Sequence, residues 1–219
     1  MKIYIVVPAY NEAKNIGQVL KDLGKTKLPV IVVDDGSKDK TYEVAKKHKV
    51  TLLRHRVNLG KGAALKTGFE AAFLKRADAV ITMDSDGQHK ISDLPQFIDK
   101  LKEEKYDIVF GSRDFSHKVP LVRSLGNQFA LNLIRLLFGV SVSDLTCGFR
   151  GVTKKAYKKM KWESSGYAVE TEMVIETGKR HLKYCEVPVE TVYYDKVKGV
   201  TVLDAIHILF DVLRWRIAK

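Results

Sequence analysis

Apolar and polar residues alternate in blocks along the first half of the chain. Short, nearly continuous apolar runs rich in Val and Ile indicate strands; they lie at residues 2–8, 29–37, 50–55 and 78–84. The segments between them place apolar residues three or four positions apart and indicate helices; they lie at residues 12–25, 39–49 and 62–77. Apolar strands that alternate with helices of this length predict an α/β fold with a parallel sheet covered on both faces.

The last residues of the chain show the pattern of an amphipathic helix. In residues 202–219 an apolar stripe recurs at spacings of three and four, formed by Leu203, Ile206, Phe210, Leu213 and Ile217. Trp215 and the basic residues near the end suit the boundary of lipid headgroups. Residues 125–142 predict a second apolar helix. Packing of these helices on the domain and binding at a membrane surface both stay open at this point.

The composition suits a single soluble domain with an unusual charge balance. The chain has 219 residues, and 38 Lys and Arg against 26 Asp and Glu give a formal net charge of +12. Such an excess favours a partner rich in phosphate, such as a nucleic acid, a phosphorylated substrate or an anionic lipid, although a merely lysine-rich surface explains it equally. The two cysteines, Cys147 and Cys185, lack metal-ligand spacing and favour a reducing compartment.

Nothing in the sequence predicts a segment that enters or crosses a membrane. The apolar part of the N-terminus is too short for a signal peptide and continues directly into a strand pattern. No stretch reaches 18 uninterrupted apolar residues, the length that a spanning helix requires. We therefore expect that nothing in this sequence spans a bilayer, and both a naturally peripheral protein and one from which a membrane region was cut away stay open.

Polar clusters follow three of the predicted strands. They read PAYNE at residues 8–12, DDGSKD at 34–39 and DSDGQH at 84–89. Ligands of open α/β sheets bind at the carboxyl ends of the strands, so three such clusters at one edge favour a site. In an extended segment Asp84 and Asp86 would point to the same side, which requires a positive charge between them. A simple turn, for which Asp, Ser and Gly are also suited, is the alternative.

The acidic pair suits the binding of a hard cation, and the common nucleotide-binding motifs do not match this chain. Two carboxylates and the amide oxygen of Gln88 would leave positions on Mg²⁺ or Mn²⁺ open for water and phosphate. The glycine-rich segment at residues 58–68 matches neither a P-loop nor a dinucleotide-binding motif. Among the histidines, only His89 lies beside the acidic pair.

Six motifs occur in an order that resembles family 2 glycosyltransferases with the GT-A fold. They read VVPAYNE, VVDDGS, NLGKGAALKTG, MDSDGQ, FGSR and DLTCGFRG, and the resemblance covers roughly residues 1–202. The chain looks most like the branch of dolichol-phosphate mannose synthases and polyprenyl-phosphate glycosyltransferases. The resemblance implies a GT-A domain at residues 1–201, with the amphipathic helix at 202–219 following it.

The resemblance also implies roles for individual residues. Asp84, Asp86 and Gln88 would hold the Mg²⁺ or Mn²⁺ ion, and Asp35 would accept a hydrogen bond from a base N–H. The nucleotide-sugar donor would be bound by Pro8, Tyr10, Glu12, Asp35, Lys61, Asp84, Ser85, Asp86, Arg113 and Lys196. The acceptor phosphate would be bound by Arg113, Arg123, Thr146 and Arg150, since a guanidinium offers paired donors to paired oxygens. The residues expected to act in catalysis are Asp86, Arg113 and Asp144.

The chain departs from the family pattern in one loop near its end. Relatives carry an Arg and a later Ser-Lys pair there, whereas this chain has Lys196 in the Arg position and Thr201 and Val202 in place of Ser-Lys. The loop therefore has one cation fewer with which to cover a diphosphate.

The resemblance implies an inverting, metal-dependent transfer of a sugar to dolichyl or polyprenyl phosphate. Mannose from GDP-mannose is the first choice of donor and glucose from UDP-glucose is the second. The alternatives are a transferase of the same fold with a soluble acceptor and a nucleotide-sugar-binding protein without catalysis. The expected partners are the donor, the lipid phosphate and a membrane surface but no nucleic acid. We expect a peripheral protein on the cytoplasmic face of the membrane, or a cytoplasmic one.

Overall fold

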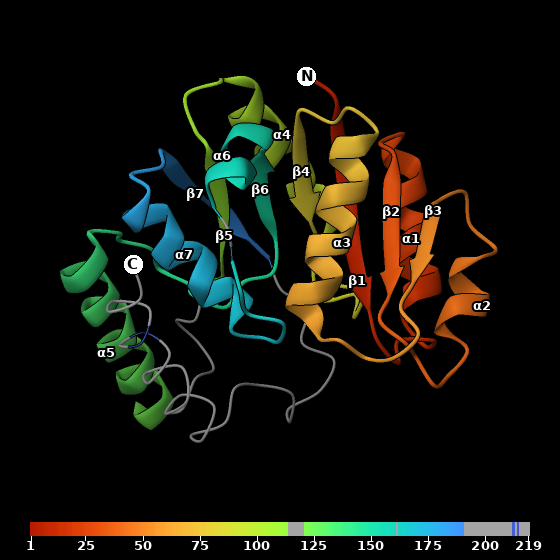
Figure 1. The fold of residues 1–219 in the computed structure, drawn as a ribbon, viewed down its shortest axis with the longest axis horizontal. Coiled ribbons are helices and arrows are strands. Elements are labelled where there is room, and N and C mark those ends of the chain that lie inside the picture. Colours follow the sequence, from red (N-terminus) through yellow and green to blue (C-terminus); the bar gives the residue numbers. More distant parts are fainter. Residues whose placement is uncertain (114–120, 161, 191–211, 213, 215–219) are drawn as a thin grey trace.

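A computed structural model describes residues 1–113, 121–160, 162–190, 212 and 214 of the chain. Its centre is a seven-stranded sheet with the strand order β3-β2-β1-β4-β6-β5-β7 (Figure 1). The strands are β1 (Ile3–Ala9), β2 (Val30–Asp34), β3 (Thr51–Arg54), β4 (Ala79–Thr82), β5 (Ile108–Arg113), β6 (Arg150–Thr153) and β7 (Tyr184–Val189). Their pairings are parallel, except that β6 runs antiparallel to both β4 and β5. The predicted α/β fold with a mostly parallel sheet is confirmed.

Helices cover both faces of the sheet. One face carries α3 (Lys61–Leu74), α5 (Leu121–Phe138), α6 (Lys154–Lys159) and α7 (Val169–Lys179), and the other carries α1 (Ile16–Leu23), α2 (Thr41–Ala45) and α4 (Leu94–Lys102). Successive side chains of β1 alternate between the two faces, so that Val6 joins one apolar cluster while Ile5 and Val7 join the other. This two-sided burial explains why the central strands are apolar without interruption.

Three predicted elements differ from the structure at their boundaries. The helix α5 ends at Phe138 rather than near residue 142, because Gly139 has a positive φ of 70° and its N–H closes the last turn onto Arg135. The helix α2 is limited to five residues within the predicted 39–49. Strand β4 ends at Thr82, so Asp84 and Asp86 lie in the following loop and not on an extended strand.

The turn after β4 corrects the geometric argument for the acidic pair. Residues Ser85 and Asp86 form a turn, and Gly87 has a φ of 79° that favours glycine. The period of two residues in a strand predicted that both aspartates point to the same side. This prediction is wrong, because neither aspartate lies on a strand. The turn and the predicted metal site are compatible with each other, because the turn at this edge of the sheet carries the carboxylates of that site.

The antiparallel strand β6 shapes the edge at which the predicted site lies. The loops after β1, β2 and β4 reach this edge at the carboxyl ends of their strands, and β5 ends at the same edge with Arg113. Because β6 runs the other way, the residues that precede it, 144–149, reach the same edge. Thr82 at the end of β4 pairs with Arg150 at the start of β6, and the Thr82 hydroxyl donates to the carbonyl oxygen of Gly148 at 2.6 Å. The loop before β6 therefore lies directly against the loop after β4.

Several predictions fall outside the described residues. These are the position of Lys196, the side chain of Arg123 and most of the helix predicted at 202–219. Within that last segment Val212 and Arg214 are helical, and Val212 is buried in the apolar cluster that includes α5 and α7. No helix in the described part of the chain has both the length and the apolar character needed to cross a bilayer.

Candidate active site

The loops after β1 and β2 are joined by hydrogen bonds between side chains and backbone. Asn11, with a left-handed φ of 55°, donates its N–H to the Ser37 hydroxyl at 2.9 Å and accepts the N–H of Lys38 at 2.8 Å. The N–H of Glu12 donates to the Thr41 hydroxyl at 2.8 Å. These bonds hold together two of the three polar clusters that the sequence places at this edge.

The residues predicted to contact a nucleoside begin in this pair of loops. Pro8 is buried in β1, whereas Tyr10 is 39% exposed and presents an aromatic ring at the end of the strand. Glu12 is half-buried and accepts a hydrogen bond from the Asn15 amide at 2.7 Å. The structure therefore brings Tyr10 and Glu12 to the predicted edge.

Asp35 is buried and its carboxylate is bound within the chain. It accepts the N–H of Leu59 at 2.9 Å and the N–H of Gly60 at 2.7 Å, one on each oxygen. The imidazole Nδ1 of His55 lies 2.7 Å from it, and the other ring nitrogen lies 2.9 Å from the Thr67 hydroxyl. Asp35 thus fixes the glycine-rich loop to the end of β2, and its role towards a nucleobase stays a prediction.

The glycine-rich segment places Lys61 at the start of α3. Gly60 has a φ of 95°, and a Cβ at Gly62 would lie 2.0 Å from the carbonyl oxygen of Ser164, so the backbone can approach only without side chains. The ammonium of Lys61 lies 2.6 Å from a carboxylate oxygen of Asp84 and 2.6 Å from one of Glu170 on α7. Burial alone would lower the pKa of Lys61, but these two carboxylates raise it well above its ordinary value.

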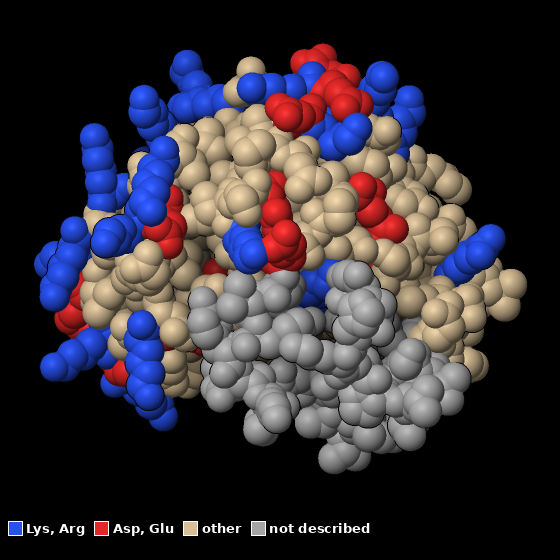
Figure 2. Space-filling view, turned by 180° about the vertical axis from the view of Figure 1, so that it is seen from behind, with Lys and Arg blue, Asp and Glu red and all other residues tan. Residues whose placement is uncertain are grey.

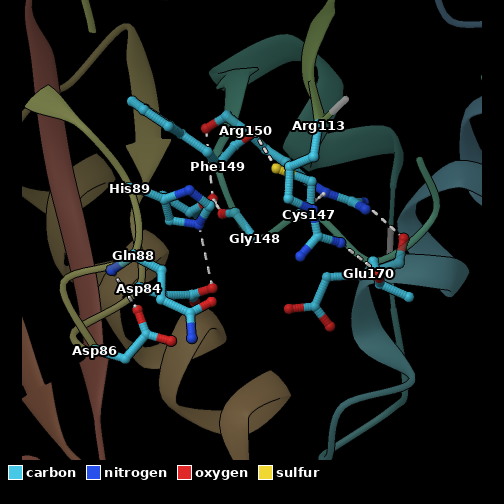
Figure 3. A network of polar contacts seen from close by, with 12 residues as sticks. Asp84, Asp86, Gln88, His89, Arg113, Cys147, Gly148, Phe149, Arg150 and Glu170 are labelled. Atoms are coloured by element: carbon cyan, nitrogen blue, oxygen red, sulfur yellow. Dashed lines mark hydrogen bonds and ion pairs between the residues drawn. The ribbon is translucent and has the colours of Figure 1, made fainter. Parts of the chain in front are cut away.

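Asp84 stands at the centre of the candidate site. Its second oxygen lies 3.4 Å from Nε2 of the buried His89, and a Cβ on Gly148 would lie 2.4 Å from that oxygen (Figure 3). Burial would raise the pKa of Asp84, but the ammonium of Lys61 and the imidazole of His89 hold it well below its usual range. Asp84 is therefore an anion in the folded protein, packed against a glycine that leaves room for it.

The rest of the predicted metal set lies on the same loop as Asp84. The carboxylate of Asp86 accepts the backbone N–H of Gln88 at 2.9 Å. Ser85, which lies between the two acids in the sequence, is buried. These residues offer the hard oxygen atoms that Mg²⁺ and Mn²⁺ prefer, and the Lys61 ammonium already occupies Asp84 as an internal cation. In the described ranges no group of three or more His, Cys, Asp or Glu side chains forms a complete metal site. An ion here would therefore need Gln88, water or a ligand's oxygens as well.

Arg113, Asp144 and Thr146 form a second cluster at the same edge. The guanidinium of Arg113 donates to both carboxylate oxygens of Asp144, at 2.6 and 3.0 Å, and to the Thr146 hydroxyl at 2.6 Å. Burial would raise the pKa of Asp144, but its bonds to Arg113 hold that pKa below the ordinary value. Three of the residues that the resemblance assigned to catalysis or to the acceptor are thus brought together.

The loop 144–149 connects this cluster with Asp84. Asp144 binds Arg113 at one end of the loop, and Gly148 contacts Asp84 near the other. Cys147 is buried between them, and burial raises the pKa of its thiol to about 12. The thiol therefore stays protonated at neutral pH and does not supply a nucleophile.

The position of Arg150 corrects one prediction. Its side chain is only 1% exposed, and its guanidinium donates to the carbonyl oxygens of Leu145, Cys147 and Glu170 at 2.8, 2.8 and 2.6 Å. The same group lies over the ring of Phe110. Arg150 therefore fixes the backbone of the loop 144–149 to α7, and this position does not fit the predicted binding of an acceptor phosphate.

Sequence reasoning missed the role of Glu170. Glutamates at positions 170, 172 and 176 interrupt the apolar residues of α7, and all three are buried. Glu172 accepts the N–H groups of Glu163 and Ser164 and so supports the loop before the helix, whereas Glu170 binds Lys61 (Figure 3 shows its carboxylate on the Asp84 side). Acidic residues in an otherwise apolar helix were the available signal.

Comparison with known proteins agrees with this arrangement. The model of the family described as glycosyl transferase family 2 matches residues 4–161. An uncharacterized protein of Methanocaldococcus jannaschii is 40% identical over 99% of this chain and 93% of its own length. The UDP-N-acetylglucosamine–dolichyl-phosphate N-acetylglucosaminyltransferase of Methanococcus voltae is 32% identical over 99% of this chain and 97% of its own length.

A solved structure shows the same fold at low sequence identity. Glucosyl-3-phosphoglycerate synthase from Mycobacterium tuberculosis, crystallised with Mn²⁺, uridine diphosphate and phosphoglyceric acid, superimposes with a TM-score of 0.77 at 20% identity. The match covers 98% of this chain and 78% of the other, which confirms the predicted GT-A fold. With the family model and the full-length relatives, it leads to one conclusion: the chain belongs to the family 2 glycosyltransferases.

Proposed function

We propose that the protein transfers a sugar from a nucleoside diphosphate to polyprenyl or dolichyl phosphate, with a divalent metal ion and with inversion at the anomeric carbon. The proposal rests on one observation: the loop 144–149 connects two charged clusters at the same edge of the sheet. Asp84 with Lys61 suits the donor's diphosphate, and Arg113 with Asp144 suits an acceptor phosphate. The loop 144–149 touches both clusters.

The donor side is supported by the residues at the ends of β1, β2 and β4. The exposed ring of Tyr10 offers a stacking surface for a base, and Asp35 remains our candidate acceptor for a base N–H. Asp84, Asp86 and Gln88 would hold Mg²⁺ or Mn²⁺, which would stabilise the charge of the departing diphosphate. Lys61 adds a further positive charge beside Asp84.

The acceptor side needs positioning rather than a strong base. A phosphate monoester is largely a dianion at neutral pH, so its oxygen attacks the anomeric carbon directly. The new carbon–oxygen bond forms as the bond to the diphosphate breaks, and the electron pair leaves with the nucleoside diphosphate. Arg113 would hold the attacking phosphate while Asp144 and Thr146 orient the guanidinium.

The donor is the finer part of the proposal. GDP-mannose is the first choice from the motif pattern, and UDP-glucose is the second. The named relative of Methanococcus voltae acts with UDP-N-acetylglucosamine, which places that sugar nucleotide among the candidates. Its acceptor, dolichyl phosphate, supports a lipid phosphate for this chain.

Contact with a membrane surface is part of the same proposal. On α5, Phe129 is 60% exposed and Leu136 is 82% exposed, and their spacing of seven residues puts them on the same face of the helix. The helix predicted at 202–219 would add a second apolar surface. On the face shown in Figure 2, most of the described Lys and Arg residues lie along the margin and a few lie near the centre, with Asp and Glu among them, so the binding of this face to anionic lipid would be diffuse.

A soluble phosphorylated acceptor is the second candidate. The solved structure that shares the fold contains phosphoglyceric acid, a small soluble phosphate. Transfer that proceeds at the same rate with a water-soluble phosphate as with polyprenyl phosphate would favour this candidate. Nucleotide binding without any transfer would favour a sensor protein.

The test begins with a thermal-shift screen of GDP- and UDP-sugars with and without Mn²⁺. A donor at a hundred times its dissociation constant adds about 2.7 kcal/mol to the free energy of unfolding, which ranks the candidates. Transfer to polyprenyl phosphate is then measured with the best donor. Asp86→Ala should abolish the Mn²⁺-dependent part of the shift, whereas Asp99→Ala, an exposed residue of α4, should keep it. An equal Mn²⁺-dependent shift in Asp86→Ala would contradict the metal assignment.

A further inference from the structure

Lys61 is an unusual choice for its position. It is the first residue of α3, and the N-terminus of a helix carries partial positive charge, which favours acids rather than lysine. Its half-buried ammonium nevertheless lies between Asp84, in the loop after β4, and Glu170, on α7. The side chain is therefore held by those two carboxylates and not by a preference of the helix.

The contacts of Asp84 leave little room for a second cation. Lys61 occupies one carboxylate oxygen, and the other oxygen faces His89 and the backbone of Gly148. A metal ion that binds Asp84 must stand next to the ammonium or replace it, and either arrangement brings two cations together. A nucleoside diphosphate removes that obstacle, because its phosphate oxygens supply negative charge for both cations.

We propose that Lys61 is a resident counter-cation that couples metal binding to donor binding. Before the donor arrives, its ammonium occupies Asp84 and opposes an ion that comes alone. When ion and diphosphate enter together, the flexible side chain turns to the diphosphate while Glu170 still pairs with it. This inference rests on the proposed metal-dependent function and adds an order to it: metal and nucleotide bind as a pair.

The test measures Mn²⁺ binding rather than sugar transfer. Free Mn²⁺ is followed by electron paramagnetic resonance during titration of the full chain, alone and with GDP or UDP. The wild type should bind Mn²⁺ weakly alone and much more tightly with the nucleotide. Lys61→Met keeps an unbranched, flexible side chain, one atom shorter, without the charge, and its affinity for Mn²⁺ alone should rise about tenfold. The gain that the nucleotide provides should shrink accordingly.

Two variants serve as controls for this test. Lys66→Met removes an exposed lysine from the same helix and should bind Mn²⁺ as the wild type does. Lys61→Arg keeps the positive charge and should keep weak binding of Mn²⁺ alone. A Lys61→Met affinity for Mn²⁺ alone that equals or falls below that of the wild type would overturn the inference, even with a normal nucleotide effect in the wild type.

A further variant keeps the test valid if Lys61→Met does not fold. Glu170→Gln leaves Asp84 as the carboxylate that holds Lys61, so Mn²⁺ alone should bind more weakly and the nucleotide should have a larger effect. Tighter binding of Mn²⁺ alone by Glu170→Gln would contradict the inference. Failure of the wild type to bind Mn²⁺ with either nucleotide would instead contradict the metal-dependent function itself.

Discussion

Two aspartates that follow strands β2 and β4 of the sheet differ in the groups that bind their carboxylates. Asp35, after β2, is held by the backbone N–H groups of Leu59 and Gly60 and by the imidazole of His55. Asp84, after β4, is held by the ammonium of Lys61 at the end of a long side chain. Both carboxylates lie at the same edge, yet backbone N–H groups bind Asp35 whereas a lysine side chain binds Asp84.

The difference shows how the same residue type serves two purposes. Backbone donors cannot leave a carboxylate without unfolding the loop that carries them, so Asp35 is a fixed part of the architecture. A lysine side chain can turn away while the backbone stays in place, so Asp84 can exchange its partner. A substitution at Asp35 should therefore lower stability in addition to weakening the base contact that we propose for it, whereas a substitution at Asp84 should leave stability largely intact and affect binding and activity.

The largest effect should follow Asp84→Asn. The variant loses the negative charge that would hold the metal ion, and sugar transfer should fall roughly a thousandfold, because such an ion stabilises the leaving group by several kcal/mol. Binding of the nucleotide without Mn²⁺ should stay close to that of the wild type. Initial rates of transfer and a metal-free binding isotherm check the two statements. A variant with wild-type activity would remove Asp84 from the site.

A smaller effect, measured on stability, should follow Asp35→Asn. The new amide nitrogen would face a backbone N–H, and the free energy of unfolding should drop by about 2–3 kcal/mol because a buried hydrogen bond is lost and a buried donor is left without an acceptor. Urea denaturation measures this change. Wild-type stability combined with weaker nucleotide binding would show that Asp35 serves the base and does not hold the loop.

The smallest effect should follow Gly148→Ala, which displaces the carboxylate of Asp84 but leaves its charge in place. Its methyl group would lie 2.4 Å from the carboxylate of Asp84, which must then move. We expect Mn²⁺ affinity in the presence of nucleotide to fall about tenfold, as overpacking of this kind costs 1–3 kcal/mol. Gly166→Ala, whose methyl group would meet no atom within 4 Å, is the matched control and should change nothing. Equal affinities for the two variants would mean that Asp84 tolerates displacement.

The first half of the fold could be predicted because local pattern and tertiary structure agree there. Apolar strands and amphipathic helices alternate up to β4, and each repeats a period that the sequence displays. The reversed strand β6 could not be predicted, since its direction depends on its partners and not on its four residues. The helix α7 also gave little signal, because it is buried nearly all round and lacks an amphipathic period.

For the candidate site, motif order identified residue types but not their contacts. It brought forward Asp84, Arg113 and Asp144, which the structure places at one edge. It could not tell that Arg150 serves three carbonyl groups, since an arginine looks the same in sequence whether it binds backbone or phosphate. It also missed Glu170, whose partner Lys61 lies in a distant motif and becomes a neighbour only after folding.

Because β6 runs in the reverse direction, the chain before it can change in sequence without a change in the strands on the other side of β4. The loop 144–149 is anchored where it enters the core at Arg150, so its end against Asp84 stays in register with β4. Under the proposed function, insertions or exchanges in the chain between β5 and this loop would alter the acceptor side, with no shift in the strands that carry the donor side. On that proposal, exchange of this one segment would change the acceptor and keep the same nucleotide chemistry.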